Sequence, residues 1–363
     1  MRFVIIMCGG RSGSDLLQSL FDSHREVIQF PGILKFSEDF LKIFNLDSPK
    51  KIAINFCNLN PHFFNSRLNL QERHNKLGNK KNSFYLIDKS VFIKNFIKFY
   101  KAGKQSNLNT LVALHKAYGQ CISKSIKKKK IIVLHIHLVE LFENYLRLIK
   151  FDKKTKILLT FRDPMASLSS AIRNYSKYKK GKILTPRGLY DNFEIHFNTF
   201  HSLKNFKNYI RVVKLEDLHK RSKKTLKNIC NYIKIQYSNT LMNSTYHGKK
   251  WWGDAISGKY LDGLNPNFKN KINMSFFSTN EFNYLETKLL PTIKRYNYES
   301  RGNIEIKRKY HFLPFGFEIN SWRNTVRGGN LKSIVSILYF YIKRILLLGK
   351  NNNYNFNYFP KKI

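Results

Sequence analysis

The first residues of the chain combine an apolar run, a glycine-rich loop and an amphipathic segment, and this order constrains the fold more than any other feature. Phe3–Met7 is apolar throughout, which is typical of a buried strand. Cys8–Ser14 contains three glycines, and apolar residues then recur at helical spacing at Leu16, Leu17, Leu20 and Phe21. A strand, a glycine loop and a helix in this order open nucleotide-binding α/β folds. We therefore expect a phosphate-binding loop at the end of the first strand.

Further apolar segments have strand character and alternate with helical ones along the chain. They are Ile131–Leu138, Lys156–Phe161 and Ile210–Leu215. Strands that alternate with helices favour an α/β fold, and we expect three layers in which a central parallel sheet is flanked by helices around a P-loop-like nucleotide-binding core. Residues from about 45 to 125 are expected to be mostly helical, with loops around 58–82.

The chain is expected to divide into a catalytic domain over residues 1–300 and a C-terminal extension over residues 301–363. In the extension, residues 331–349 predict an apolar helix carrying Lys332, Lys343, Arg344 and Lys350, while Asn351–Asn357 is typical of a frayed tail. The pair Lys343-Arg344 interrupts the apolar run short of the roughly 18 residues that a membrane-spanning helix needs. The helix either docks on the catalytic domain or makes peripheral contact with an anionic membrane surface.

The charge of the chain indicates anionic partners. Its 363 residues include 65 Lys and Arg against 23 Asp and Glu, a formal net charge of +42. A phosphorylated ligand, a nucleic acid and a membrane surface all fit this charge. A/T-rich codons favour Lys, Asn, Ile, Phe and Tyr, all common here, so particular Arg residues carry more information than the Lys excess. A hydrophobic content of 42% excludes a largely disordered chain.

The cysteines and the N-terminus indicate an intracellular location. The four cysteines (Cys8, Cys57, Cys121 and Cys230) form no CxxC pair and no metal-ligand pattern with histidine, so we expect neither a disulfide framework nor a metal site. The N-terminal apolar run is too short for a signal peptide or an anchor. The sequence therefore predicts a cytoplasmic protein, with contact to the inner membrane face through the C-terminal helix as the open alternative.

The glycine loop is the first candidate site. Glycines let backbone N–H groups converge on a phosphate, and the helix that follows presents its positive end to the same anion. Arg11 adds a fixed charge that can grip phosphate oxygens. A Walker loop would need GxxxxGK[ST], and the absence of that lysine argues against a P-loop kinase.

The second candidate site is the segment Phe161–Ser170. Asp163 suits an N-cap and Pro164 suits the first helical position, so Arg162 is expected at a strand end, directly before a helix N-terminus. Ser170 lies close to two helical turns beyond Asp163 and so returns to nearly the same face. A basic residue and a hydroxyl aimed at one place describe a second anion site.

Together these motifs resemble the sulfotransferase family whose donor is 3′-phosphoadenosine-5′-phosphosulfate (PAPS). The resemblance covers residues 3 to about 255 and is carried by the pattern G-x-[KR]-S-G-[ST] and by Arg-Asp-Pro with a serine eight residues after the arginine. Val213–Leu218 and Gly248–Asp254 look like two later segments of the family. The resemblance implies that the 5′-phosphosulfate is bound by Gly10, Arg11, Ser12, Gly13, Ser14 and Asp15, the 3′-phosphate by Arg162 and Ser170, and that Lys249 and Lys250 lie in a basic loop closing over the 3′-phosphate.

Two residues depart from the family pattern. Arg11 replaces a frequent lysine and can still neutralise the phosphate that leaves during transfer. Asp15 replaces a usual hydroxyl, and three roles stay open for it: stabilising the first helical turn, orienting the acceptor or weakening donor binding.

The base that removes the acceptor proton also has open alternatives. The strand candidate Ile131–Leu138 holds His135 and His137 on one face, and His137 is nearer its carboxyl end, where ligands gather. Histidine titrates near neutral pH and suits proton removal, but it can equally be packed beside the sheet. Other family members use a glutamate after the first helix, which makes Glu38 the competing base.

The sequence thus predicts a sulfotransferase that moves a sulfuryl group from PAPS to a hydroxyl of a carbohydrate or glycolipid, such as a lipid-linked glycan, without a metal. The alternatives are a P-loop-like ATP-dependent kinase and a non-enzymatic basic protein that binds RNA or a membrane. Neither nucleic acid nor membrane binding explains two arginines at helix starts, so nucleic acid is not expected as a partner. Trp251 and Trp252 either stack on a sugar or anchor a loop, and the remaining histidines are expected on the solvated surface.

Overall fold

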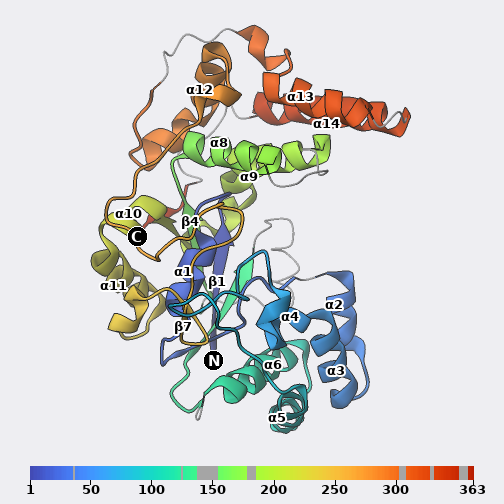
Figure 1. Ribbon diagram of the computed structural model, residues 1–363, viewed down its shortest axis with the longest axis vertical. Coiled ribbons are helices and arrows are strands. Elements are labelled where there is room, and N and C mark those ends of the chain that lie inside the picture. The colour runs from blue at the N-terminus through green and yellow to red at the C-terminus, as the bar shows by residue number, and fades with distance from the viewer. Residues whose placement is uncertain are drawn as a thin grey trace.

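A computed structural model describes residues 1–35, 37–123, 126–136, 154–177, 185–301, 308–327, 331–350 and 359–363. Its centre is a six-stranded sheet in the order β2-β3-β1-β4-β5-β8, and every strand is parallel to its neighbours. The strands are β1 (Arg2–Cys8), β2 (Val27–Gln29), β3 (Ile131–Ile136), β4 (Lys156–Phe161), β5 (Ile210–Lys214) and β8 (Lys361–Lys362). Helices cover both faces of this sheet (Figure 1), so the predicted three-layer α/β fold is confirmed.

The alternation of side chains along β1 explains the two covered faces. Val4 and Ile6 pack with α1 (Ser14–Phe21) and α11 (Ser222–Ile233) on one face. Phe3, Ile5 and Met7 belong to a second apolar cluster on the other face, with residues of α3 (Pro49–Leu59), α5 (Lys89–Lys101), α6 (Asn107–Ile122) and α9 (Pro186–Ser202). Because both faces of the strand are buried, its sequence is a continuous apolar run.

A third apolar cluster joins the C-terminal helices to the rest of the molecule. It is built from residues of α8 (Pro164–Lys177), α9, α12 (Thr279–Arg295), α13 (Gly316–Val326) and α14 (Leu331–Lys350). These helices lie at one end of the elongated molecule, and α2 (Glu38–Lys42), α3, α5 and α6 lie at the other (Figure 1). The helix predicted over residues 331–349 is therefore present and docked on α9 and α13.

The remaining elements are short. They are the helices α4 (Pro61–Phe64) and α10 (Leu215–Lys220), the two-stranded antiparallel sheet of β6 (Thr245–Tyr246) and β7 (Lys249–Lys250), and 3-10 turns at Ile43–Asn45, Ser66–Leu68, Lys204–Tyr209, Asn239–Met242, Met274–Phe276 and Arg308–His311.

Among the described residues of the C-terminal extension, α13 and α14 are helical and β8 pairs with β5. Two expectations from the sequence are wrong. Arg344 does not lie on the surface of the C-terminal helix but is buried against Glu318. Several histidines expected in solvent are buried: His24, His74, His115, His196 and His219. Asn351–Asn357 lies outside the described residues.

Candidate anion-binding site

The strand order reverses at β1, and both predicted anion motifs are at this point. From β1 the chain runs to β2 and β3 on one side, then crosses to β4 and β5 on the other. In open α/β sheets, ligands bind outside the carboxyl ends of the strands at such a reversal. β1 and β4 pair there with Cys8 level with Thr160, so the glycine loop after Cys8 and Arg162 after Phe161 leave the sheet side by side.

The glycine loop is fixed to the sheet by the Ser12 side chain. The Ser12 hydroxyl accepts a hydrogen bond from Gly9 N (3.1 Å) and lies 2.8 Å from Thr160 Oγ1. Thr160 Oγ1 itself donates to Met7 O (3.0 Å), so Ser12 is the donor of the pair. The buried hydroxyl of Ser12 therefore holds the loop in place, and its backbone N–H is the group that can face an anion.

The backbone of the loop has the geometry of an anion cradle. Gly10, Arg11 and Gly13 have φ angles of 75°, 39° and 83°. Within the described ranges, the N–H groups from Gly10 to Gly13 donate to no protein acceptor, and α1 begins at Ser14 without a side-chain cap. Successive N–H groups in such a turn converge on an anion, and the helix dipole adds to the attraction. A non-glycine residue at positive φ, such as Arg11, is also typical of ligand sites.

Close packing explains why two loop positions are glycine. A Cβ atom on Gly10 would lie 2.9 Å from His196 Cε1 and from Ile195 Cγ2, and one on Gly13 would lie 2.5 Å from Leu215 Cδ1. Both residues also have positive φ angles, which L side chains rarely adopt. A side chain at either position would therefore displace the loop.

Two residues that sequence reasoning missed connect the glycine loop to α8 and α9. The Ser167 hydroxyl donates to Gly10 O, and His196 Nε2 lies 2.9 Å from the same hydroxyl. His196 Nδ1 lies 2.7 Å from Asn192 O, and burial lowers the His196 pKa to about 4, so the ring is neutral at physiological pH. The Ser at position 167 lies within the predicted second motif, but nothing in the sequence indicates that His196 approaches the loop from α9.

Arg11 extends from the loop toward a carboxylate. Its Nη1 atom lies 3.6 Å from Asp254 Oδ2, an ion pair longer than a hydrogen bond. Its Nε atom is buried and has no hydrogen-bond acceptor in the part of the chain that the structure describes. A buried guanidinium N–H beside four free backbone N–H groups fits the binding of an anion.

Arg162 lies close enough to Arg11 for the positive charge of Arg11 to act on it. Burial lowers the Arg162 pKa, and the positive charges of Arg11 and Arg173 act in the same direction, while Glu216 and Asp163 oppose them. The cationic groups of both predicted motifs therefore share one region of the structure. Bringing like charges together is unfavourable unless anions accompany them, as the nearby carboxylates and a bound phosphate would.

The Arg162 side chain is held by a segment that the sequence did not single out. Its Nε donates to Asn270 Oδ1 (2.8 Å), and its guanidinium lies 5.5 Å from the centre of the Phe268 ring. Asn270 Nδ2 donates to Glu216 Oε1 (2.6 Å), which also accepts the backbone N–H of Asp163 (3.0 Å). The segment Val213–Leu218 thus lies beside the second motif. The exposed Lys269 and Lys271 flank Asn270 and bring further positive charge to this place.

The helix start predicted for the second motif is confirmed. Asp163 Oδ1 accepts the backbone N–H of Ala166 (2.8 Å), as an N-cap does, and Pro164 is the first residue of α8. Asp163 Oδ2 also pairs with Arg301 (2.9 Å). Ser170 is half-buried on α8, and its hydroxyl has no hydrogen-bond partner within the described residues.

Lys249 and Lys250 lie elsewhere, at the other end of α1. The β6–β7 turn is held there because Asp22 accepts the backbone N–H groups of His247 (3.0 Å) and Gly248 (2.9 Å), about 12 Å along the helix from the loop. Lys250 pairs with Asp262 (2.7 Å). The structure does not bring these two lysines to Arg162.

The two tryptophans that follow β7 anchor their loop. The indole N–H of Trp251 donates to Glu72 O (2.6 Å), and that of Trp252 donates to Gly78 O (2.7 Å). Trp251 is buried edge-on against Tyr246. The structure therefore favours loop anchoring over sugar stacking for this pair. The same loop carries Asp254, which pairs with Arg11.

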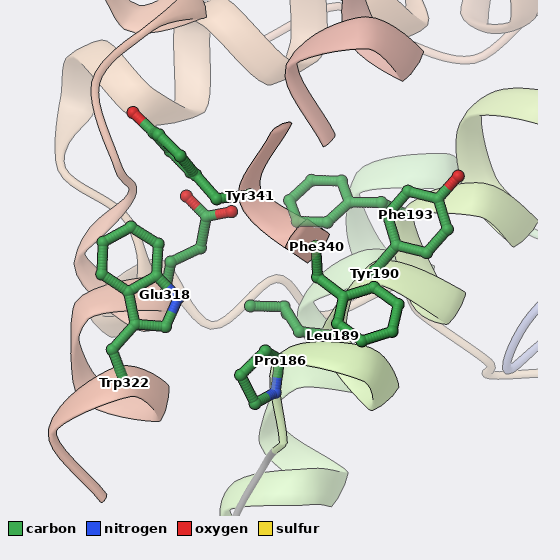
Figure 2. A pocket seen from close by; sticks show the side chains of 8 residues that line it. All are labelled: Pro186, Leu189, Tyr190, Phe193, Glu318, Trp322, Phe340 and Tyr341. Carbon is green, nitrogen blue, oxygen red and sulfur yellow. The ribbon is translucent and has the colours of Figure 1, made fainter. Parts of the chain in front are cut away.

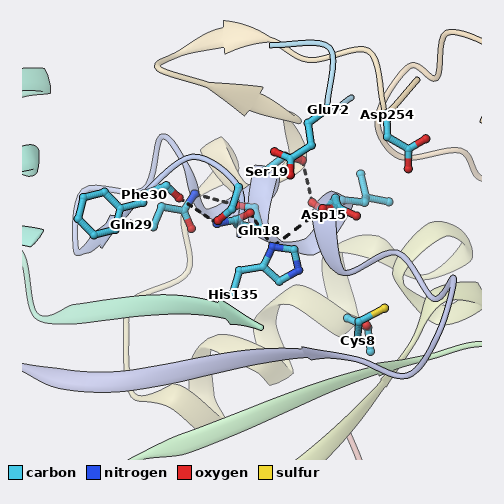
Figure 3. A network of polar contacts seen from close by, with 12 residues as sticks. Cys8, Asp15, Gln18, Ser19, Gln29, Phe30, Glu72, His135 and Asp254 are labelled. Atoms are coloured by element: carbon cyan, nitrogen blue, oxygen red, sulfur yellow. Dashed lines mark hydrogen bonds and ion pairs between the residues drawn. The ribbon is translucent and has the colours of Figure 1, made fainter. Parts of the chain in front are cut away.

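Asp15, the departure from the family pattern, lies in the first turn of α1 beside His135 (Figure 3). His135 Nδ1 lies 2.9 Å from Gln18 Oε1 and 3.9 Å from Asp15 Oδ1. Gln18 Nε2 donates to Phe30 O and Gly32 O (both 2.9 Å), which fixes Oε1 as the acceptor, so His135 carries its proton on Nδ1. His135 thus aligns α1 with β3 and with the segment after β2.

The two candidate bases are in different situations. β3 ends at Ile136, level with Met7 of β1, and His137 is the next residue along the chain but lies outside the described residues. Glu38 is the exposed first residue of α2, whose N-terminus is capped by Ser37. No contact of Glu38 with the glycine loop is present among the described residues. Nor does the described part of the chain contain a cluster of three or more His, Cys, Asp or Glu residues that could hold a metal ion.

No protein-family model and no curated protein matches the chain. The solved structures that are similar to it include two sulfotransferase domains. The sulfotransferase domain from the Synechococcus PCC 7002 olefin synthase is 15% identical with a TM-score of 0.40, over 71% of this chain and 80% of that one. The sulfotransferase domain from the curacin biosynthetic pathway is 15% identical with a TM-score of 0.41, over 83% of this chain and 99% of that one. Likeness at this level bears on no residue of the site.

Proposed function

We propose that this protein is a sulfotransferase that uses PAPS as its donor. The observation that carries the proposal is the convergence of two anion-binding motifs at the strand reversal. Arg11 belongs to a loop whose four backbone N–H groups donate to no acceptor in the described part of the chain, and the positive charge of Arg11 acts on Arg162. PAPS carries anionic groups at both its 5′ and 3′ positions, and such a donor would engage both motifs at once.

The residues present fit this donor. The N–H groups from Gly10 to Gly13, together with the start of α1, would hold the 5′-phosphosulfate. Arg162, together with Ser170 of α8, would hold the 3′-phosphate. Lys269 and Lys271 flank Asn270, which accepts a hydrogen bond from Arg162. We further propose that these two lysines supply the positive charge that the sequence resemblance assigned to Lys249 and Lys250.

PAPS supplies an activated sulfuryl group whose bond to the 5′-phosphate oxygen breaks as the acceptor oxygen bonds to sulfur. Arg11 and the loop N–H groups stabilise the negative charge that grows on the departing phosphate, leaving 3′-phosphoadenosine 5′-phosphate (PAP). The acceptor proton passes to a base, for which we propose His137, the residue after the β3 end that is level with Met7. Glu38 is the competing base.

For the acceptor we propose a hydroxyl of a carbohydrate, either a free glycan or the head of a glycolipid. Asp15 and Glu72 both raise the pKa of buried Tyr246, although burial is the larger cause, so two carboxylates lie on the same side of α1 (Figure 3). Carboxylate oxygens accept hydrogen bonds from sugar hydroxyls and repel anionic acceptors. In this proposal Asp15 orients the acceptor.

The test is sulfuryl transfer itself. The protein is incubated with PAPS and a panel of neutral glycans and glycolipids, and PAP release is measured. Arg11→Ala should lower kcat by about 10²–10³, typical for loss of a preorganised electrostatic donor. The matched control is Arg67→Ala, an exposed arginine that lies on the Phe84 ring, and it should leave kcat unchanged. An ATP-dependent kinase would instead release ADP from ATP and ignore PAPS.

A further inference from the structure

The helix α14 is docked by one face only, and its opposite face is apolar and exposed. Its inward face contributes Ile337, Arg344, Leu347 and Leu348, all buried. Its outward face carries a run of large apolar side chains, which we name the α14 stripe: Leu331, Ile334, Val335, Leu338, Tyr339, Ile342 and Leu346. At 3.6 residues per turn these positions fall along one side of the helix.

The α14 stripe is exposed because α14 is held firmly in one orientation. Arg344 is 1% exposed, and its Nε and Nη2 atoms donate to the two carboxylate oxygens of Glu318, each at 3.1 Å. The same guanidinium donates to His311 O (2.7 Å) and Leu313 O (3.0 Å). These bonds fix the rotation of α14 about its own axis, so the stripe must face outward. Contiguous exposed apolar patches of this kind mark interaction surfaces.

The surroundings of the α14 stripe are positively charged, which favours an anionic partner. From Arg308 to Lys350 the sequence has eight Lys and Arg residues and a single acidic residue, Glu318, which is buried and paired with Arg344. Arg323 on α13, Arg327 directly after α13 and Lys332 on α14 are exposed. Lys343 lies 4.8 Å from the centre of the Tyr339 ring at the edge of the stripe. Two carboxylates of α9, Asp191 and Glu194, act on Tyr190 nearby, so the positive charges still outnumber the negative ones.

The aromatic residues beside α14 include tyrosine and tryptophan, which are common at membrane surfaces. A hollow between α9, α13 and α14 is lined in part by Tyr190, Trp322, Phe340 and Tyr341 (Figure 2). Tyrosine and tryptophan prefer the boundary between hydrocarbon and water, because one part of each ring is apolar and another is polar. No helix in the described ranges is both long and apolar enough to cross a bilayer.

We propose that the α14 stripe inserts into the surface of an anionic lipid bilayer, with the basic residues of α13 and α14 at the level of the headgroups. Apolar side chains enter the acyl boundary while flanking Lys and Arg contact anionic headgroups, as in interfacial helices. A second copy of the chain is disfavoured as the occupant because it would bring two strongly basic surfaces together. This inference does not depend on the sulfotransferase proposal.

The experiment is sedimentation of the full-length protein with vesicles, without donor or acceptor. Vesicles of phosphatidylcholine with phosphatidylglycerol are compared with vesicles of phosphatidylcholine alone. The wild type should bind the anionic vesicles, and the double variant Val335→Glu/Leu338→Glu should bind at least tenfold more weakly. These side chains are 60% and 56% exposed, so the variant should fold, which circular dichroism checks.

The matched control is Leu70→Glu/Leu86→Glu, two leucines that are 64% and 62% exposed outside this region. It adds the same charge and should bind within twofold of the wild type. Arg327→Gln/Lys332→Gln should weaken binding to anionic vesicles by about fivefold for each charge removed.

Three results would overturn the proposal. The wild type does not bind anionic vesicles at low ionic strength, the stripe variant binds as well as its control, or the wild type is a dimer in solution and the stripe variant is a monomer.

Discussion

Arg344→Met removes one partner of the buried ion pair that docks α14. The side chain keeps roughly its volume, but Glu318 loses both N–H donors from the guanidinium, and two backbone carbonyls, His311 O and Leu313 O, lose theirs. Among the described contacts, the Glu318 carboxylate then keeps the backbone N–H of Phe315 (2.8 Å).

The expected loss of stability is large because the remaining charge cannot reach water. Breaking a buried pair by removing one partner costs about 3–5 kcal/mol. An unfolding entropy of about 2.1 cal/mol/K per residue gives roughly 0.76 kcal/mol/K for this chain, so Tm should fall by about 4–7 °C. Adding Glu318→Gln to Arg344→Met removes the stranded charge and should restore at least half of the loss.

The effect should depend on pH. Burial raises the Glu318 pKa, and the charge of Arg344 opposes that rise. Without Arg344 the folded-state pKa rises further above the unfolded value of about 4.3. The folded state then holds a proton that the unfolded state releases, so the stability of the variant falls as pH rises through this window. Arg344→Met should therefore be destabilised more at pH 8 than at pH 5.

Thermal unfolding followed by circular dichroism measures these effects. The control is Lys332→Met, an exposed cation on the same helix, which should shift Tm by less than about 1 °C. The reasoning is refuted if Arg344→Met unfolds at the same temperature as this control, or if Glu318→Gln makes the variant still less stable.

Two further predictions concern the proposed reaction. Replacing Lys269 and Lys271 with glutamine should weaken PAP binding about tenfold or more and leave 5′-AMP binding unchanged. The same replacement of the two lysines of β7 should change the affinity for neither nucleotide, as calorimetric titration would show. A loss of PAP affinity only in the β7 variant would contradict the assignment. His137→Ala should slow transfer by about 10²-fold or more at unchanged PAP affinity in a PAP-release assay, and full activity in that variant with loss in Glu38→Ala would move the base to Glu38.

The sequence predicted those features that depend on local pattern. Strand β4 has the predicted bounds, and the N-cap at Asp163 and the glycine loop before α1 are where spacing placed them. Each of these is encoded within about ten neighbouring residues, so one stretch of sequence suffices to find it.

The features that were missed depend on contacts between distant parts of the chain. Strand β8 has two residues and exists because it pairs with β5. Asn270 reaches Arg162 across 108 positions of sequence, and Arg344 finds Glu318 across 26. A buried arginine and an exposed one look alike in a helical pattern, because only the packed partner decides which it is.

The central claim is that the two motifs together bind a nucleotide with phosphates at both ends of its ribose. Isothermal titration of the wild type and of Arg162→Ala with PAP and with 5′-AMP tests it most directly, because the two ligands differ only in the 3′-phosphate. The wild type should prefer PAP, and Arg162→Ala should remove about 1.5–3 kcal/mol of that preference, roughly 10- to 150-fold in the affinity ratio. Equal affinity of the wild type for PAP and 5′-AMP would contradict the proposed donor site.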